Sequence, residues 1–282
     1  MDKVNFALFA TAIVLVSTLL LPSFALSVFS KPLQRLYNSY SLNWAGYYVT
    51  GSTYNYASAT WTVPSVKITN SGYSSAWVGI GGVNGNQYLI QTGTEQDCIG
   101  GATTGGQSKF HGLMMEDSAV VNVQLPSSSK KPSCNPIYYA WWEIYPVNAE
   151  QVIPNFSVYA GDTITASVQQ TSTPGVWLIT ISDTHKGKTQ TFTTTQTFSP
   201  DQSTAEAIIE RPALCFVSCQ LTNLANFGTI TFSNAAVGSS TSYFNLLPNT
   251  IVSMTNNAGK ILANTGSLSN PGTFSVNWVK SS

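Results

Sequence analysis

Apolar and polar residues alternate along much of this 282-residue chain. In residues 57–63, the apolar side chains of Ala57, Ala59, Trp61 and Val63 would share one side and the intervening serine and threonines the other. Three more segments carry the same pattern, with apolar faces formed by Val121, Val123 and Leu125, by Ile164, Ala166 and Val168, and by Phe274, Val276 and Trp278. A period of two is typical of half-buried antiparallel strands. Clusters of Gly, Pro, Asn and Ser separate these segments, and no long helical pattern or internal repeat is found, so we predict one all-β sandwich.

The N-terminal segment has a different pattern. Lys3 precedes an apolar run over residues 6–21, which is followed by Pro22 and the small-residue sequence "SFA". We interpret residues 1–25 as a secretory signal peptide, residues 26–40 as a short spacer or pro-segment, and residues 41–282 as the β-sandwich domain. An uncleaved membrane anchor is the alternative, because the run is slightly long. We expect a secreted, extracellular protein that does not contact a membrane unless this segment is retained.

Charge excludes one class of partner. Only 9% of the residues are charged, and 12 Lys plus Arg balance 12 Asp plus Glu. Binding to nucleic acid requires clustered basic residues that neutralise phosphates, and no basic run is present. We therefore expect no nucleic-acid partner, and we expect a monomer.

Four cysteines are present: Cys98, Cys134, Cys215 and Cys219. An even number in an exported chain indicates disulfides. The short spacing of Cys215 and Cys219 favours pairing those two and leaves Cys98 for Cys134, although the sequence permits all three pairings. A zinc site is disfavoured, because the cysteine spacing is not that of zinc knuckles and both histidines, His111 and His185, lie far away.

Common catalytic motifs are missing. The chain contains no Gly-x-Ser-x-Gly, no His-Glu-x-x-His, and neither Asp-Thr-Gly nor Asp-Ser-Gly. His111 and His185 lie in segments that we interpret as ordinary loop or surface positions. Carboxylates and amides therefore remain as the chemical groups, and we expect no metal and no cofactor.

Four glutamates occur in apolar or aromatic segments: Glu95, Glu143, Glu206 and Glu210. If residues 141–145 form a strand, Trp141, Glu143 and Tyr145 share a face. Desolvation among such aromatics would raise the pKa of Glu143. A glutamate that only hydrogen-bonds a neighbouring strand is an equally good interpretation of this segment alone.

Residues 203–212, "STAEAIIERP", place Glu206 and Glu210 around an apolar pair. Ser203 and Glu206 fit a helix capping box, but only a turn or two fits before Pro212, so a strand is favoured. In a strand, both glutamates lie on one face about 13 Å apart, too far to share a proton. Without further information, an edge strand with a solvated polar face is the simplest interpretation.

Six segments together resemble the glutamic peptidases, the eqolisin family. In chain order they are "NWAGYYV" (43–49), "ATWTVP" (59–64), "SAWVGIGG" (75–82), "LIQTG" (89–93), "WWEIYP" (141–146) and "AEAIIERP" (205–212). Each segment alone is a weak signal, but the ordered combination is specific. It implies a concanavalin A-like sandwich of two antiparallel sheets.

The resemblance also implies roles for individual residues. The catalytic glutamine falls on Gln91 and the catalytic glutamate on Glu210. Trp77 falls beside the active site, Glu143 is a supporting acid, and Glu206 matches a motif glutamate without an evident role. Trp141 and Tyr145 are further candidates for substrate binding or support.

These residues suit hydrolysis of peptide bonds. A Glu210 carboxylate can take a proton from water and return it to the leaving nitrogen, while the Gln91 amide orients the water and donates to the oxyanion. The function implied is a secreted acid endopeptidase acting on polypeptide substrates. The alternative is a glycoside hydrolase or a lectin on a similar sandwich, with Glu143 and Glu210 as paired acids and Trp77, Trp141 and Trp142 stacking on sugars.

Overall fold

The fold was analysed in a computed structural model, which describes residues 37–68, 71–83, 88–100, 134–215, 219–238 and 242–282. Seventeen strands and one short 3-10 helix are present in these ranges. The first eight strands are β1 (Tyr37–Ser41), β2 (Trp44–Val49), β3 (Tyr56–Thr62), β4 (Ser75–Gly81), β5 (Leu89–Ile99), β6 (Asn135–Tyr145), β7 (Asn148–Val152) and β8 (Thr163–Gln170). The rest are β9 (Val176–His185), β10 (Lys188–Thr197), β11 (Ala205–Glu210), β12 (Ala213–Cys215), β13 (Cys219–Leu221), β14 (Thr229–Val237), η1 (Phe244–Leu246), β15 (Asn249–Thr255), β16 (Ile261–Thr265) and β17 (Phe274–Trp278).

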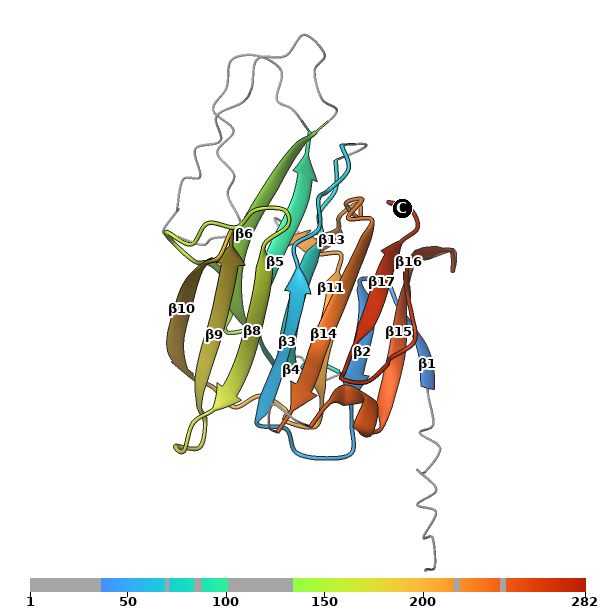
Figure 1. Cartoon of the computed structure of the whole chain (residues 1–282). Coiled ribbons are helices and arrows are strands. Elements are labelled where there is room, and N and C mark those ends of the chain that lie inside the picture. The colour runs from blue at the N-terminus through green and yellow to red at the C-terminus, as the bar shows by residue number, and fades with distance from the viewer. Residues whose placement is uncertain (1–36, 69–70, 84–87, 101–133, 216–218, 239–241) are drawn as a thin grey trace, which may run out of the picture. The chain divides into compact units, whose positions relative to one another are not determined.

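Two antiparallel layers face each other, as predicted (Figure 1). One layer has the order β10-β9-β8-β3-β14-β17, and the other has the order β2-β11-β4-β5-β6-β7. Strands β16 and β15 connect the layers, so that one hydrogen-bonded path runs through both. Two details depart from a plain pair of antiparallel sheets: β1 pairs with β15 in parallel, and β12 and β13 form a separate hairpin.

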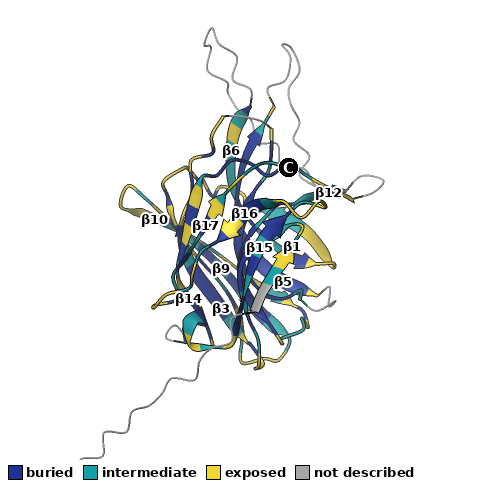
Figure 2. Cartoon of the chain, turned by 90° about the vertical axis from the view of Figure 1, so that its right-hand side faces the viewer, coloured by how far each residue is buried: buried dark blue, intermediate teal, exposed yellow. Residues whose placement is uncertain are grey.

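The core lies between the layers and follows from the alternation in the sequence. Every apolar residue of the predicted faces at 57–63, 164–168 and 274–276 is buried, and Trp278 is partly buried. In the outer layer, buried and exposed positions alternate along strands such as β8 and β14, so that one face of each strand is turned to the core (Figure 2). Aromatic rings fill the centre, where Phe274 stacks on Phe232 with ring centroids 5.1 Å apart and meets Tyr47 edge-on at 4.8 Å.

Strand β11 is an interior strand. It pairs with β2 on one side and with β4 on the other over all six residues. The helical alternative for this segment is therefore wrong, and so is the edge strand with a solvated polar face. The side chain of Glu206 is completely buried.

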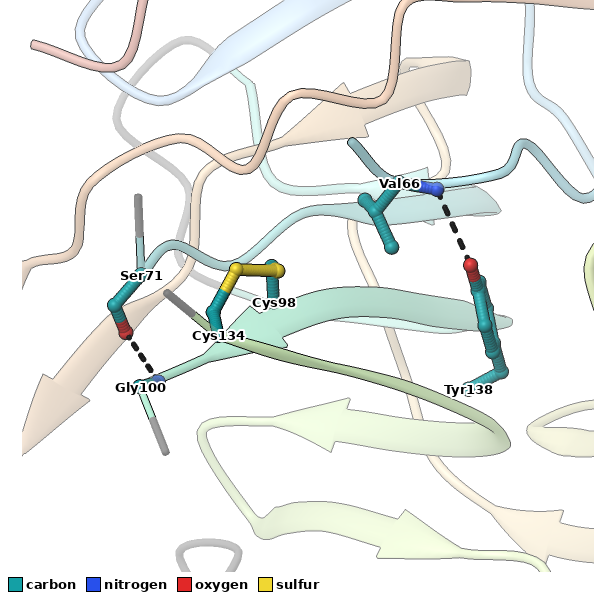
Figure 3. Close-up of a disulfide and its surroundings, with 6 residues drawn as sticks. All are labelled: Val66, Ser71, Cys98, Gly100, Cys134 and Tyr138. Atoms are coloured by element: carbon teal, nitrogen blue, oxygen red, sulfur yellow. Dashed lines mark hydrogen bonds between the residues drawn. A yellow bond between two sulfur atoms is a disulfide. The ribbon is translucent and has the colours of Figure 1, made fainter. Parts of the chain in front are cut away.

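The predicted Cys98–Cys134 disulfide is present and joins the end of β5 to the start of β6 (Figure 3). Nearby, the backbone N–H of Gly100 donates to Ser71 Oγ at 3.1 Å, and that of Val66 donates to the Tyr138 hydroxyl at 3.1 Å. Cys219 also lies in a disulfide and is opposite Cys215 in the ladder between β12 and β13. The pairing of Cys215 with Cys219 stays a prediction.

Several expectations fall outside the described residues. These are the signal peptide at 1–25, most of the spacer at 26–40, the strand around Val121, Val123 and Leu125, and His111. Among the residues that the structure does describe, no helix has the length and apolar character needed to cross a bilayer.

Candidate active site

The candidate residues lie on one face of the layer that contains β11, β4, β5 and β6. The register places Glu206, Gly79, Gln91 and Glu143 in one row across these strands. A second row, four residues away along the strands, runs through Glu210, Ser75, Glu95 and Tyr139. Because side chains alternate between the two faces, this register makes Gln91 and Glu210 project on the same side.

A buried apolar cluster supports this face. It consists of Trp77, Leu89, Trp141 and Ile208, with Trp44 and Tyr139 packed against it. A Cβ atom at Gly93 would lie 2.2 Å from the carbonyl oxygen of Ala76 and 2.6 Å from Cβ of Trp77. Position 93 therefore needs glycine, and its missing side chain lets Trp77 lie directly on the sheet.

Glu210 ends β11 and is held by three side-chain donors. Nε1 of Trp77 donates to Oε2 at 2.9 Å, and Nδ2 of Asn43 donates to Oε1 at 3.0 Å. The side chain of Trp44 forms a third hydrogen bond with the same carboxylate. The rings of Trp44 and Trp77 meet edge-on with centroids 5.0 Å apart, so packing fixes both indoles. The carboxylate is thus fixed in position while remaining partly exposed.

Gln91 is almost fully buried and interacts with Glu143. Its Nε2 donates to Oε2 of Glu143 at 2.5 Å, directly across the β5–β6 ladder. The amide oxygen Oε1 of Gln91 has no hydrogen-bond partner among the described residues. This geometry commits one amide hydrogen and leaves the other hydrogen and the oxygen for further interactions.

Burial raises the pKa of Glu143 and Glu210, the two partly exposed acids of these rows. The pKa of Glu210 is raised to about 7 by burial and by the charge of Glu143, against the three donors that lower it. The pKa of Glu143 is also raised to about 7 by burial, against the hydrogen bond from Gln91. The charge of Glu143 is thus one of the two causes that raise the pKa of Glu210.

Glu206 lies on the same face but is closed off from solvent. Neither of its carboxyl oxygens has a hydrogen-bond partner among the described residues. Burial, with a contribution from Asp201, raises its pKa well above the usual range. Burial therefore favours the neutral form of Glu206.

Four residues of this face were missed as site residues by sequence reasoning: Tyr139, Glu150, Glu95 and Asp97. Besides burial, the charge of Glu150 raises the pKa of Tyr139, and the charges of Asp97 and Glu150 raise that of Glu95. Burial raises the pKa of Glu150 to about 8 and that of Asp97 to about 7. Asn43 and Trp44 were also missed, although both stand in the quoted "NWAGYYV" segment. Their place within this family segment was the signal that could have identified them as site residues.

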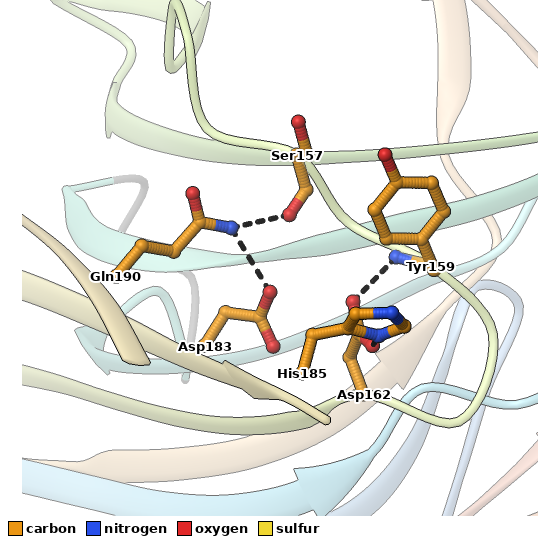
Figure 4. A network of polar contacts seen from close by, with 6 residues as sticks. All are labelled: Ser157, Tyr159, Asp162, Asp183, His185 and Gln190. Carbon is orange, nitrogen blue, oxygen red and sulfur yellow. Dashed lines mark hydrogen bonds and ion pairs between the residues drawn. The ribbon is translucent and has the colours of Figure 1, made fainter. Parts of the chain in front are cut away.

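A separate polar network lies at the end of β9 (Figure 4). Nδ1 of His185 contacts Oδ1 of Asp162, which is buried, and the ring of His185 packs near Tyr159. Gln190 donates to Asp183 at 3.0 Å. His185 is therefore more than the ordinary surface residue that the sequence suggested. Within the described ranges, no group of three metal-ligating side chains could hold a metal ion.

Comparison with known proteins identifies the family. The model of the peptidase A4 family matches residues 42–112 and 128–278. This chain belongs to the peptidase A4 family. The resemblance to glutamic peptidases is thereby confirmed. Aspergillopepsin-2 of Aspergillus niger is 28% identical over 218 residues, which is 70% of this chain and 64% of that protein, so the chain spans just under two thirds of its relative.

Solved structures agree with the fold. Scytalido-glutamic peptidase bound to a transition state analog inhibitor matches with a TM-score of 0.61, at 22% identity over 85% of this chain and 99% of that one. SCP-B, a member of the eqolisin family of peptidases in complex with the tripeptide Ala-Ile-His, matches with a TM-score of 0.58 at 21% identity, over the same 85% and 99%. These similarities support the β-sandwich for this chain.

Proposed function

We propose that this chain is a secreted acid endopeptidase in which Glu210 and Gln91 activate water for attack on a peptide bond. One observation carries this proposal. Trp77, Asn43 and Trp44 position the carboxyl group of Glu210 on the same face of the sheet as Gln91. Membership of the peptidase A4 family supports the reaction class. Polypeptide substrates follow from that class.

The chemistry follows from the donors and acceptors present. Glu210 in its ionised form takes a proton from water, whose oxygen then attacks the carbonyl carbon of the substrate. The unpartnered Oε1 of Gln91 can accept a hydrogen bond from that water, and its second amide hydrogen can donate to the oxyanion. When the tetrahedral intermediate collapses, Glu210 returns its proton to the leaving nitrogen.

Glu143 has a supporting role in this scheme. By accepting from Nε2 of Gln91 it fixes the orientation of the amide, so that the oxygen and the second hydrogen face the reacting groups. Among the described residues, no hydrogen bond joins Gln91 directly to Glu210, and in this proposal a single water molecule bridges the two side chains.

The carbohydrate alternative is less well supported. Stacking on sugars needs exposed aromatic faces, whereas Trp77 is fully buried and Trp141 is 3% exposed. Trp142 packs against the core on the other face of β6. The three tryptophans are therefore packed within the protein, and none of them offers an exposed ring face on which a sugar could stack.

Hydrolysis of casein, xylan and glucan at acidic pH tests the proposal. We expect peptide products from casein only, and loss of activity in Glu210→Gln and Gln91→Ala. Asp201→Asn is a matched control, because it neutralises a carboxyl group in the turn before β11. Full casein hydrolysis by Glu210→Gln, or release of sugar by the wild type, would contradict the proposed function.

A further inference from the structure

Ser41, the last residue of β1, uses its whole hydrogen-bonding capacity on the segment that holds Glu210. Its Oγ accepts from the backbone N–H of Asn43 at 3.2 Å and from that of Trp44 at 3.1 Å. The hydroxyl donates in turn to Oδ1 of Asn43 at 3.0 Å. A serine hydroxyl has one hydrogen and two lone pairs, so these three contacts leave it nothing further to donate or accept.

These contacts decide which way the side-chain amide of Asn43 faces. Backbone N–H groups can only donate, so they fill both lone pairs of Ser41, and its one hydrogen is left for Asn43. The atom of Asn43 that faces Ser41 must therefore be the oxygen. The amide nitrogen Nδ2 is then turned to Glu210, and it donates to Oε1 at 3.0 Å.

The backbone of this segment is held separately, by Arg211. The backbone N–H of Arg211 donates to the carbonyl oxygen of Asn43 at 2.7 Å, and its guanidinium donates to that of Leu42 at 2.7 Å. Trp44 is also fixed, because it lies opposite Glu210 in the ladder between β2 and β11. Since other groups hold the main chain, the hydroxyl of Ser41 chiefly sets the direction of the Asn43 amide.

We propose that Ser41 is a positioning residue that makes Asn43 a partner able only to donate to Glu210. This inference rests on the proposed function. The indole of Trp77, which donates to the other carboxyl oxygen at 2.9 Å, can also only donate. A proton that Glu210 takes from water therefore finds no acceptor in either side chain, and it stays available for the leaving nitrogen.

Without the hydroxyl, the amide of Asn43 can turn its oxygen toward Glu210. That oxygen accepts a hydrogen bond from the protonated carboxyl group and repels the ionised one, so the pKa of Glu210 rises. The ionised form is the one that takes a proton from water, and the acidic limb of the rate profile therefore moves to higher pH. The other ionisable groups on neighbouring positions stay in place when Ser41 is changed: Tyr139 and Glu143 on β6, Glu150 on β7, Glu95 on β5, Glu206 on β11, and Arg211.

Ser41→Ala tests this role through the pH dependence of kcat. We expect the acidic limb to move to higher pH by about 0.5 to 1 unit, with KM unchanged. Ser41→Thr keeps the hydroxyl and should leave the limb at its wild-type position. Ser39→Ala removes another hydroxyl from β1 and is the matched control. An unmoved limb in Ser41→Ala, or an equal shift in Ser39→Ala, would overturn the role.

A double variant tests whether Ser41 acts through Asn43. Asn43→Ala removes the donor itself and should move the acidic limb in the same direction. Adding Ser41→Ala to Asn43→Ala should then move it no further, because no amide is left to orient. A second shift of similar size would show that Ser41 acts on Glu210 by another route, which would overturn the inference.

Titration of the glutamate carboxyl carbons by NMR separates this inference from the proposed function, since it needs no substrate. In Ser41→Ala the midpoint of Glu210 should move to higher pH, with Glu210→Gln used to assign the signal. If that midpoint moves but the wild type cleaves no peptide, the orientation by Ser41 stands and the peptidase function fails. If peptides are cleaved but neither the midpoint nor the limb moves, the function stands and the role of Ser41 is overturned.

Discussion

The side-chain amide of Gln91 donates its hydrogen bond to Glu143, across the ladder between β5 and β6, and makes no such bond with Glu210. The two residues assigned to catalysis are therefore held by different partners, Gln91 by Glu143 and Glu210 by two indoles and Asn43. Each side chain is thus oriented by its own partners. The variants that follow separate these supports.

Glu143→Gln should lower kcat by about 10²-fold, the range seen when one oxyanion-hole donor is lost. An amide at position 143 can turn its own NH₂ toward Gln91, which leaves the orientation of the Gln91 amide undefined. Initial rates on a peptide substrate measure the effect. Glu143→Asp, which keeps the charge but shortens the side chain, should lose less. Equal rates for Glu143→Gln and the wild type would remove Glu143 from the site.

Trp77→Phe should weaken catalysis most at low pH. The indole donates to Glu210, and this hydrogen bond lowers the pKa of the carboxyl group. Without the donor the pKa of Glu210 rises further, so a smaller fraction is ionised at acidic pH and the acidic limb of the rate profile moves to higher pH. Trp61→Phe is the control, because Trp61 donates to Thr94 within the core. A shift of the same size in both variants would contradict the specific role of Trp77.

Glu206→Gln should stabilise the fold at neutral pH. The folded-state pKa of Glu206 is raised well above 4.5 by burial. The folded protein therefore holds a proton that the unfolded chain releases, so stability falls as the pH rises from about 4.5 toward the folded pKa, by about 1.4 kcal/mol per pH unit at most. The glutamine variant escapes this loss. Thermal unfolding should show equal Tm values near pH 4 and a higher Tm for the variant at pH 7.5. A variant less stable at both pH values would show that Glu206 has a partner.

The alternation of apolar residues predicted the strands and the face of each site residue, because side-chain direction in a strand depends only on parity. The shared face of Gln91 and Glu210 follows only once the pairing of β11 with β4 and of β4 with β5 is known. Parity says nothing of which strands are neighbours, and this is why β11 resembled an edge strand. Its interior position between β2 and β4 depends on long-range pairing.

Some residues of the site were missed for the same reason, because their contacts depend on long-range strand pairing. Asn43 reaches Glu210 because β2 and β11 pair across 167 residues of sequence. Glu150 lies opposite Glu143 because β7 pairs with β6, and the pattern within either strand does not contain that pairing. A local sequence pattern carries no information on which strands pair. A family motif can preserve residues that meet through such pairing. The motif that contains Asn43 was the one signal that pointed to this residue.

Removal of the Cys98–Cys134 disulfide should destabilise the fold by about 3 to 4 kcal/mol, since it closes a separation of 36 residues. Cys98→Ala with Cys134→Ala avoids leaving a free thiol, and both sites are fully buried. Thermal unfolding at acidic pH measures the effect. Mass spectrometry of the unreduced wild type should find no free thiols. Four free thiols would contradict the disulfides altogether.

The rate of casein hydrolysis should fall as the pH rises above about 7, where the second carboxyl of the pair loses its proton. The proposed reaction needs one proton on the pair formed by Glu143 and Glu210. At low pH both carboxyls are protonated and Glu210 cannot accept a proton from water. Above about pH 7 both are ionised, so the second negative charge opposes the developing oxyanion. Pepstatin should not inhibit, because no pair of aspartates shares the catalytic proton, and chelators should not inhibit a reaction that uses only a carboxylate and an amide. A profile that keeps rising above pH 8, or inhibition by either reagent, would contradict the Glu210–Gln91 mechanism.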